Sequence, residues 1–418
     1  MYIEKKGYSK NRLICYYITL MVIISSMFVI QFGNKQMFLW MQILFVIFMV
    51  LYTNKICVLP YLIINFIFFE LFISAAVAFT SSMPDNYKHT ALNLSIMLLP
   101  LYFTLSYSRR LLLRGHNIFA LVIKALKIAV IIQLTWFGIQ MLCYYGLGLD
   151  INKLIFVDTF HLVDNASFIR NWVWYPSGLT WHSAILGPLY VFGFIIFNNP
   201  YIRVLILIES IFCGNSTLLI GVILCALLLF VGALKGGKIR ISMRFLIAFF
   251  IIGILGFLVI ARYDLIEKIQ TVFINLWLRF FGGQKDDSTL AHLGYYSDYL
   301  KIVKKSTLSQ IIFGYGFGCS GYTITTMYNR YSLASTWAIE SDIVNILVSR
   351  GIVGFVAYYY FLFTTMVKGA KIDYRYFVFI MVVIVQGFGY NVQFDYVYMI
   401  EALMYISIKM KLNFFESA

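Results

Sequence analysis

Apolar segments of about 20 residues recur along almost the entire chain, and they constrain its fold more than any other feature. A transmembrane helix needs about 20 mostly apolar residues to cross the hydrocarbon core of a bilayer. Charged residues make up 12% of the 418 residues, about half the share of a soluble domain, and the mean hydropathy is +0.83. We therefore predict an all-α polytopic membrane protein, with residues 1–418 as one integral membrane domain. The twelve predicted spans are residues 13–30, 37–52, 58–79, 91–107, 120–145, 183–198, 202–213, 217–234, 243–261, 342–367, 374–390 and 395–410.

Basic residues indicate the number and direction of these spans, because lysine and arginine are enriched in short cytoplasmic loops. With twelve spans, all the basic segments fall on one side, which predicts that both termini are cytoplasmic. If residues 202–234 were one tilted helix instead of two, residues 368–375 would lie opposite residues 235–244. The net charge of +15 is then mostly a sign of topology, and we expect no nucleic-acid partner. The basic segments are residues 5–12, 108–114, 235–244, 368–375 and 409–411.

Two long segments, residues 146–182 and 262–341, are predicted on the outer side, where loops of this length are usually functional. In the first, RNWVWYPSGLTWH (170–182) places three tryptophans beside Arg170. This composition suits anchoring at the membrane interface and equally the stacking of sugars beside a cation.

The second outer segment contains two predicted helices. Residues 263–281 have apolar side chains at helical spacing, which predicts an interfacial helix that ends near Arg279. A second helix is expected at about 290–305, followed by GYGFG (314–318), which we interpret as a structural turn rather than a phosphate cradle. The next residues, CSGYTITTMYNRY, have an irregular or strand-like pattern.

The stretch ESDIVNILVSRGIVG (340–354) opens a predicted span with carboxylates and then places Arg350 inside it. A rise of 1.5 Å per residue puts Arg350 roughly 15 Å beyond Glu340, about halfway into the hydrocarbon core. The helix dipole accounts for acidic residues at the start but not for the arginine, which needs a cavity or a partner. Gly351 and Gly354 are interpreted as a small face for close helix packing.

Three further carboxylates lie inside predicted spans: Glu70, Glu209 and Glu401. Intramembrane carboxylates can line a water-filled path or relay protons, which is typical of a transporter. They can equally serve as partners of Arg350, Lys124 or Lys127. The residues alone leave these alternatives open.

Three of these segments resemble the superfamily of O-antigen polymerases (Wzy) and O-antigen ligases. YPSGLTWHSAILGPL is similar to the family's pattern before a span, AHLGYYSDYLKIVKKSTLSQIIFGYGFG to its helix with a Gly-x-Gly turn, and ESDIVNILVSRGIVG to its polar pair followed by an apolar helix. Ligases carry His-Asn where this chain has Glu340 and Ser341, so the polymerases are the better match.

The sequence departs from the family pattern in three places. The arginine expected just before the glycine of the first outer segment is missing, with Arg170 further back. His292 stands where an arginine is expected before the Gly-x-Gly turn. At the mid-chain span boundary, Asn215, Ser216 and Thr217 replace the usual Ser-Arg pair.

The resemblance implies a GT-C-like helical bundle that joins undecaprenyl-diphosphate-linked oligosaccharides on the periplasmic face of the bacterial inner membrane. Cations would stabilise the leaving diphosphate and a carboxylate or histidine would accept the hydroxyl proton. No metal or cofactor is implied; membrane lipids, a chain-length regulator and a flippase are the implied partners. The alternatives are an O-antigen ligase or other lipid-linked glycosyltransferase, and a flippase for the same lipid-linked oligosaccharide. The candidate catalytic residues are Glu340, Arg279, His292 and Asp342, and the candidate substrate-binding residues are Arg170, Arg350, Trp174, Tyr295 and Lys301.

Within this assignment, Glu340 is the expected base, with Asp342 as its alternative. Arg279 and Arg170 would bind the diphosphate. His292 would assist there or at the acceptor sugar. The sugars joined and the linkage formed are not encoded in any pattern that we recognise.

Overall fold

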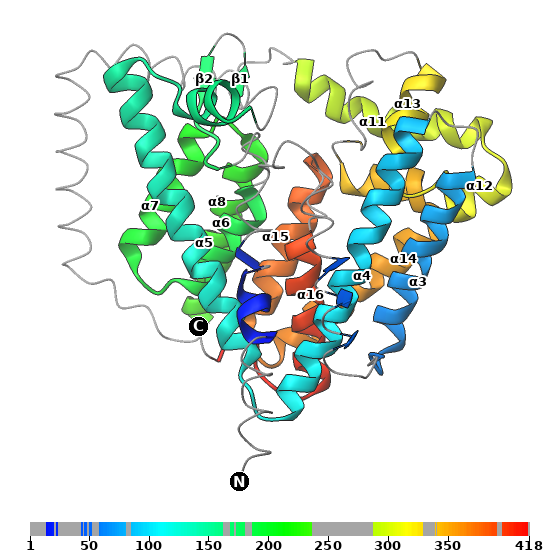
Figure 1. Ribbon diagram of the computed structural model, residues 1–418, viewed down its shortest axis with the longest axis horizontal. Coiled ribbons are helices and arrows are strands. Elements are labelled where there is room, and N and C mark those ends of the chain that lie inside the picture. Colours follow the sequence, from blue (N-terminus) through cyan, green and yellow to red (C-terminus); the bar gives the residue numbers. More distant parts are fainter. Residues whose placement is uncertain are drawn as a thin grey trace.

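The computed structural model is mostly helical (Figure 1). It describes residues 14–20, 22–23, 43–44, 46–47, 50–51, 58–80, 85–161, 168–170, 173–179, 186–235, 287–328, 339, 341–390 and 395–416. The α-helices with described bounds are α3 (Leu62–Thr80), α4 (Asp85–Leu113), α5 (Ile118–Met141), α6 (Leu186–Ile196), α7 (Pro200–Phe212), α8 (Ser216–Lys235), α11 (Asp287–Lys305), α12 (Leu308–Phe313), α13 (Ser320–Tyr328), α14 (Asp342–Ala370), α15 (Tyr374–Gly389) and α16 (Asp395–Lys409).

Nine of these helices coincide with predicted spans, namely α3 to α8 and α14 to α16. Among the described residues, two helical stretches are long and apolar enough to cross a membrane, Ile118–Gly146 and Asp342–Ala370, and four shorter helices are also apolar. The count of twelve spans and their direction stay predictions. The predicted span at 243–261 and the interfacial helix at 263–281 lie outside the described residues, and the spans at 13–30 and 37–52 are described only in part.

Residues 200–235 form two helices and not one. Asn199 caps α7 by accepting a hydrogen bond from the Tyr201 backbone, and Pro200 occupies the first helical position, where its missing N–H costs nothing. Gly214, with φ of +62°, then separates α7 from α8. The helices predicted at 202–213 and 217–234 are therefore confirmed as separate elements.

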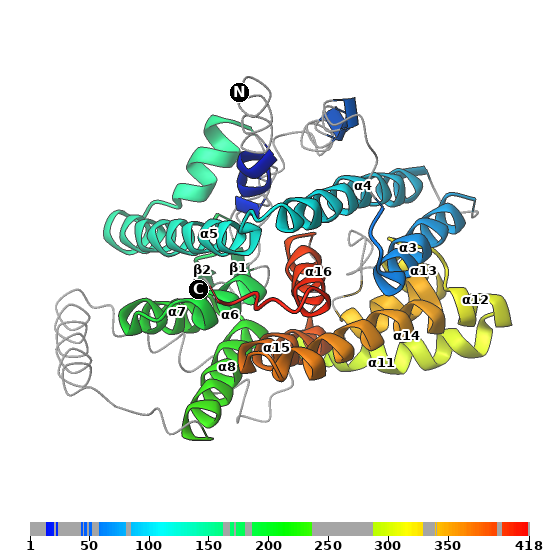
Figure 2. The ribbon, with the colours of Figure 1, turned by 90° about the horizontal axis from the view of Figure 1, so that it is seen from below.

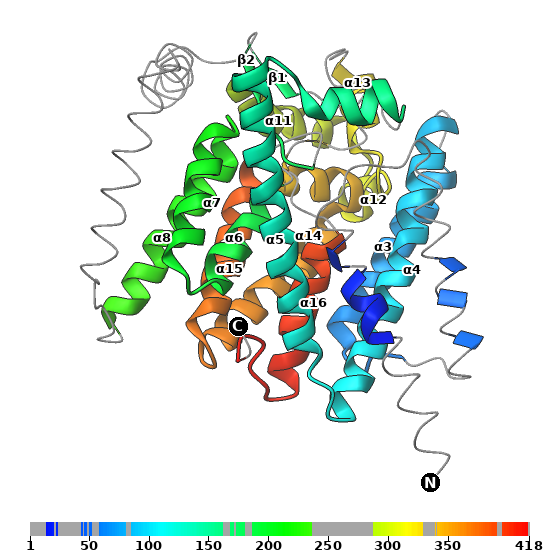
Figure 3. The same ribbon diagram turned by 60° about the vertical axis from the view of Figure 1, so that its left-hand side comes forward.

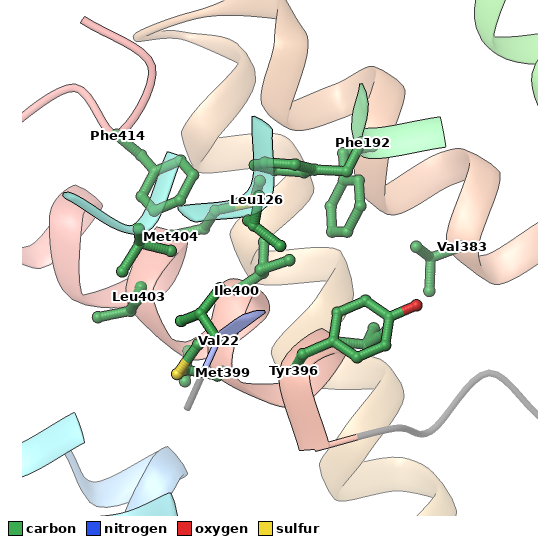
Figure 4. Packing of buried hydrophobic residues seen from close by; sticks show 14 of the residues in the cluster. Val22, Leu126, Phe192, Val383, Tyr396, Met399, Ile400, Leu403, Met404 and Phe414 are labelled. Carbon is green, nitrogen blue, oxygen red and sulfur yellow. The ribbon is translucent and has the colours of Figure 1, made fainter. Parts of the chain in front are cut away.

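Helix α16 lies at the centre of the bundle, with α4, α5, α6, α15 and α14 around it (Figure 2). Its side chains are almost entirely buried, as are their neighbours on the surrounding helices. Figure 4 shows Leu126, Phe192 and Val383 packed with the α16 residues and with Phe414 of the C-terminal segment. Apolar burial of this extent fixes the helices that carry the polar residues described below.

The first outer segment contains structure that the sequence did not predict. The π-helix η1 (Leu142–Gly146) ends the helical stretch that begins with α5, and the first outer segment follows it. That segment contains a second π-helix, η2 (Lys153–Thr159), and the strands β1 (Phe168–Arg170) and β2 (Val173–Tyr175), which pair antiparallel. The two short strands are the exception to an otherwise helical fold among the described residues.

The second outer segment folds over the start of α14. Helices α11 and α13 lie above α14 in Figure 3, and α12 packs along it. The predicted helix at 290–305 is confirmed as α11. The irregular or strand-like expectation for the residues after GYGFG is wrong, since Ser320–Tyr328 form α13. Packing of α13 against α11 and α14 overrides the β-branched composition of that stretch.

Candidate functional site

A buried arginine joins α14 to α3. The Arg350 side chain is 1% exposed, and its Nε donates to both carboxylate oxygens of Glu70, at 3.2 and 2.8 Å, while Nη2 donates to Oε2 at 2.5 Å. Such a bidentate arrangement is the strongest common form of the pair. The hypothesis that one of the carboxylates in the predicted spans pairs with Arg350 is confirmed, and Glu70 is the partner.

Two tyrosines extend this pair into a polar network. Arg350 Nη1 donates to the Tyr398 hydroxyl at 3.5 Å, and its guanidinium carbon lies 5.9 Å from the centre of the Tyr358 ring. The Tyr358 hydroxyl lies 3.2 Å from both carboxylate oxygens of Glu401 and donates to them. The network therefore unites α3, α14 and α16 around one cation and two carboxylates.

Asp342 adds a third carboxylate at the first turn of α14. It is 2% exposed and lies within electrostatic range of Tyr358, Tyr398 and Glu401. The Ser341 carbonyl begins the helix by accepting the Asn345 N–H at 2.8 Å, yet the Ser341 side chain makes no capping hydrogen bond. Asp342 thus faces the interior of the bundle, where acidic groups are costly and commonly functional.

Helix α14 is broken immediately after the arginine. Gly351 has φ of +65° and ψ of −166°, a conformation that favours glycine, so it breaks the helix, which we did not predict. A Cβ at Gly351 would also collide with the backbone of Ile312 in α12, and Gly354 lies close to the side chains of Arg350 and Glu70, so both glycines allow the close packing that we predicted.

The GYGFG turn occupies this break. Tyr315 N donates to the Val348 carbonyl and Gly316 N to the Ser349 carbonyl, each at 2.9 Å. The Ser74 hydroxyl on α3 donates to the same Ser349 oxygen, also at 2.9 Å. Carbonyls that the broken helix cannot satisfy are therefore paired, and the turn is structural, as we interpreted it.

The backbone on either side of Glu340 is held by hydrogen bonds. Ser320 Oγ accepts the Ile339 N–H at 3.2 Å and donates to Asn345 Oδ1 at 2.5 Å. On the other side, Tyr296 and Ser341 approach within 3.2 Å through their hydroxyls. Glu340 itself, like Arg279, lies outside the described residues.

The other predicted residues on α11 have different environments. Tyr295 is buried in an apolar cluster with residues of α13 and α14, so it contributes to the packing of α11 and α13 on α14. Lys301 is 54% exposed and pairs with Asp298 at 3.2 Å. His292 lies in α11, but its side chain is outside the description.

Trp174 and Arg170 occupy the hairpin of the first outer segment. The Trp174 ring stacks on Tyr144 at 4.0 Å between ring centres, and its Nε1 donates to Asp150 at 3.0 Å. Its 5% exposure makes it an anchor of this segment rather than an open platform. Arg170 pairs with Val173 in the hairpin, and its side chain is not described. The structure does not bring either residue to the network around Arg350 by any contact among the described side chains.

The remaining intramembrane carboxylate, Glu209, accepts a hydrogen bond from Tyr190. Lys127 lies over the Phe197 ring, 5.8 Å from its centre. Neither contact joins Glu209 to the Arg350 network, so Glu209 forms a buried acidic site separate from that network.

Sequence reasoning missed three members of the network: Ser74, Tyr358 and Tyr398. The spacing of four between Glu70 and Ser74 puts both on one face of an apolar helix, and Tyr398 precedes Glu401 by one turn. Two polar residues on one face of a predicted span could have indicated that this face is buried against another polar group.

Cysteine chemistry does not contribute to this site. Burial raises the pKa of the Cys319 thiol, beside the GYGFG turn, to about 12, so it stays protonated and packs against Ala78.

Comparisons with protein-family models, with curated proteins and with solved structures give no match for this chain. Its function is therefore argued from its own residues.

Proposed function

We propose that this chain is a polymerase-type glycosyltransferase of the bacterial inner membrane, with twelve spans, cytoplasmic termini and a periplasmic active site. Its donor and acceptor are undecaprenyl-diphosphate-linked oligosaccharides, and its product is a longer lipid-linked surface polysaccharide such as O antigen. The proposal combines the resemblance of three sequence segments with the arrangement of the residues at the head of α14.

One observation carries the proposal beyond the resemblance. The segment that resembles the family's second outer loop packs, as α11 to α13, over the helix that resembles its catalytic helix, and the polar head of that helix lies at this junction. Asp342 and the chain on either side of Glu340 are held where α11 and α13 meet the bundle interior, and we assign α11 and α13 to the periplasmic side. A glycan held outside and a lipid held in the bilayer must meet at such a boundary.

The chemistry assigned to these residues is a displacement at the donor's anomeric carbon. The acceptor hydroxyl oxygen forms the new glycosidic bond, the bond from carbon to the diphosphate oxygen breaks, and the diphosphate leaves with the electron pair. Glu340 takes the hydroxyl proton, with Asp342 as its alternative. Arg279 and Arg170 neutralise the diphosphate, and His292 assists there or at the acceptor. Lys301 remains a proposed substrate-binding residue, whereas the buried side chains of Trp174, Tyr295 and Arg350 serve packing and positioning in this proposal. No metal and no cofactor take part.

The test is gene deletion followed by electrophoresis of the surface polysaccharide. Loss of the ladder with a single repeat unit remaining on its acceptor supports the polymerase. Complementation with Glu340→Ala and Arg279→Ala then tests the site, and Lys304→Ala, an exposed lysine of α11, is the matched control. Normal polymer length and yield from Glu340→Ala would remove Glu340 from the role of base. If lipid-linked polymer accumulates unattached, the protein is a ligase.

A flippase for the same lipid-linked oligosaccharide is the second candidate, favoured by one specific observation. Helix α14 is discontinuous at Gly351, and broken helices beside buried charges form the substrate sites of many transporters. The buried carboxylates Glu209 and Glu401 fit that class as well. Repeat units trapped on the cytoplasmic leaflet after gene deletion would establish the flippase and exclude the polymerase.

A further inference from the structure

Helix α3 holds α14 through two side chains that lie one helical turn apart. Glu70 binds the Arg350 side chain, and Ser74 Oγ donates to the Ser349 carbonyl. The Ser74 carbonyl in turn accepts the Phe317 N–H at 3.0 Å. Helix α3, the GYGFG turn and the break in α14 therefore meet at one point, although they come from three distant parts of the sequence.

The packing at this point leaves no space for a different fit. A Cβ at Gly316 would collide with Ala78 of α3, and a Cβ at Gly314 would collide with the backbone of Ser349 and Arg350. These clashes involve mainly backbone atoms, so a change of side-chain rotamer cannot relieve them, and the turn can pack against α3 and α14 in this position alone.

The break also divides α14 mechanically. A continuous helix transmits its direction through its own hydrogen bonds, but at Gly351 the Val348 and Ser349 carbonyls bond outside the helix. The direction of the first half, Asp342–Arg350, is consequently set by what binds it from outside and not by the second half of α14.

We propose that Glu70 and Ser74 are positioning residues that orient the Asp342–Arg350 half of α14 and thereby place the residues at 340 and 342 for catalysis. Neither residue touches substrate in this proposal, and both act through α14. The catalytic consequence rests on the proposed function, whereas the effect on the orientation of the half-helix does not.

Removing only Glu70 would leave the Arg350 charge buried and unpaired, which is strongly destabilising. The informative variant is therefore the neutral double Glu70→Gln/Arg350→Gln, which removes both charges together and keeps a polar side chain at each position. We expect it to accumulate in the membrane near the wild-type level, with transfer of repeat units per molecule roughly 10- to 100-fold lower, because a displacement of about 1 Å has that effect. Ser74→Ala should reduce the transfer of repeat units by a smaller factor, because the Gly316 N–H still donates to the Ser349 carbonyl.

The charge-reversed double Glu70→Arg/Arg350→Glu distinguishes an effect on the orientation of the Asp342–Arg350 half-helix from an effect on folding alone. It restores a bidentate pair between the same two helices, so it should recover at least part of the transfer lost in the Gln/Gln double. A purely structural role predicts instead that transfer in each variant falls in proportion to the amount of folded protein, and that outcome would overturn the proposal.

A labelling experiment tests the orientation without reference to polysaccharide. Ser341 is fully buried at the head of α14, so Ser341→Cys should react slowly with a membrane-impermeant maleimide, and roughly tenfold faster or more in the Gln/Gln background. Thr365→Cys, buried on the second half of α14, is the control and should not change. Equal labelling of Ser341→Cys in both backgrounds would overturn the proposal. If polymer is unaffected by gene deletion but labelling rises as expected, only the proposed function fails.

Discussion

Two arginine–carboxylate pairs, one that joins α3 to α14 and one at the start of α15, differ in burial and in the distance along the chain between their partners. Arg350 and Glu70 are 1% and 10% exposed and are 280 residues apart in sequence. Arg375 and Asp373 are 26% and 16% exposed and two residues apart, at the start of α15. The first pair joins two helices inside the bundle, whereas the second shapes a turn.

The difference shows that burial, more than bond geometry, determines the role of such a pair. Both carboxylates accept two or more hydrogen bonds from their arginine. Water can take over when the partly exposed pair is broken, but nothing replaces the partner of a fully buried guanidinium. Four predictions sharpen this contrast; each can be measured on the detergent-solubilised protein by thermal unfolding, with reaction of the buried thiols of Cys213 and Cys225 as the signal.

The largest effect is expected from Arg350→Ala or Glu70→Ala. Each leaves one buried charge unpaired and should lower stability by about 3–5 kcal/mol. The apolar double Glu70→Leu/Arg350→Met removes both charges and should recover most of that loss. A double variant no more stable than the single variants would show that the pair is not the cause.

Gly316→Ala should cost about 2–4 kcal/mol, since it adds a Cβ against the Ala78 backbone and strains a residue with φ of +116°. Gly138→Ala in α5 is the matched control. Its added Cβ meets nothing within 4 Å, so this change should be neutral or slightly stabilising. Equal effects at the two positions would contradict close docking of the turn.

Trp174→Phe keeps an aromatic ring on Tyr144 but removes the indole N–H that Asp150 accepts. We expect a loss of about 1–2 kcal/mol, typical of a hydrogen bond to a charged group. Local proteolysis of residues 142–175 should increase in the same variant. Unchanged proteolysis would mean that Trp174 does not anchor the first outer segment.

The smallest effect on stability should come from the partly exposed pair of Arg375 and Asp373, and it depends on pH. Burial alone would raise the pKa of Asp373, but hydrogen bonds from Arg375 and Asn413 lower it below its ordinary value. The carboxylate therefore contributes stability at pH values above its unfolded pKa of about 3.9, and this is lost as pH falls through the lower folded value.

Asp373→Asn should cost about 1 kcal/mol or less at neutral pH, given the exposure of the pair. In acid the difference between variant and wild type should shrink. A difference that grows as pH falls below about 4 would have the wrong sign for a carboxylate with a lowered pKa.

Helix positions followed closely from the sequence, because an apolar segment that is predicted to cross a bilayer must be helical in order to pair its own backbone. The need for a partner at Arg350 also followed, since a lone intramembrane charge is costly. Which carboxylate provides it did not follow: Glu70, Glu209 and Glu401 have equivalent local surroundings, and only the packing of α3 against α14 selects Glu70.

The break at Gly351 was not predicted, because its cause lies elsewhere in the chain. A glycine in an apolar helix can be a packing site or a break, and here donors from Ser74, Tyr315 and Gly316 satisfy the carbonyls at the break. The same applies to α13, whose β-branched residues favour a strand until docking on α14 overrides them. Local sequence patterns predicted the positions of most helices. Contacts between segments that are distant in the sequence determined the break in α14 and the helical form of α13.

The break in α14 also bears on the order in which the protein is made. The Val348 and Ser349 carbonyls of its first half accept hydrogen bonds from Ser74, Tyr315 and Gly316, and a buried carbonyl left unpaired costs about 1–3 kcal/mol. All three donors precede α14 in the chain, so they have left the ribosome before it does. Synthesis from the N-terminus thus delivers the partners first, and α14 can complete its hydrogen bonds as soon as it packs.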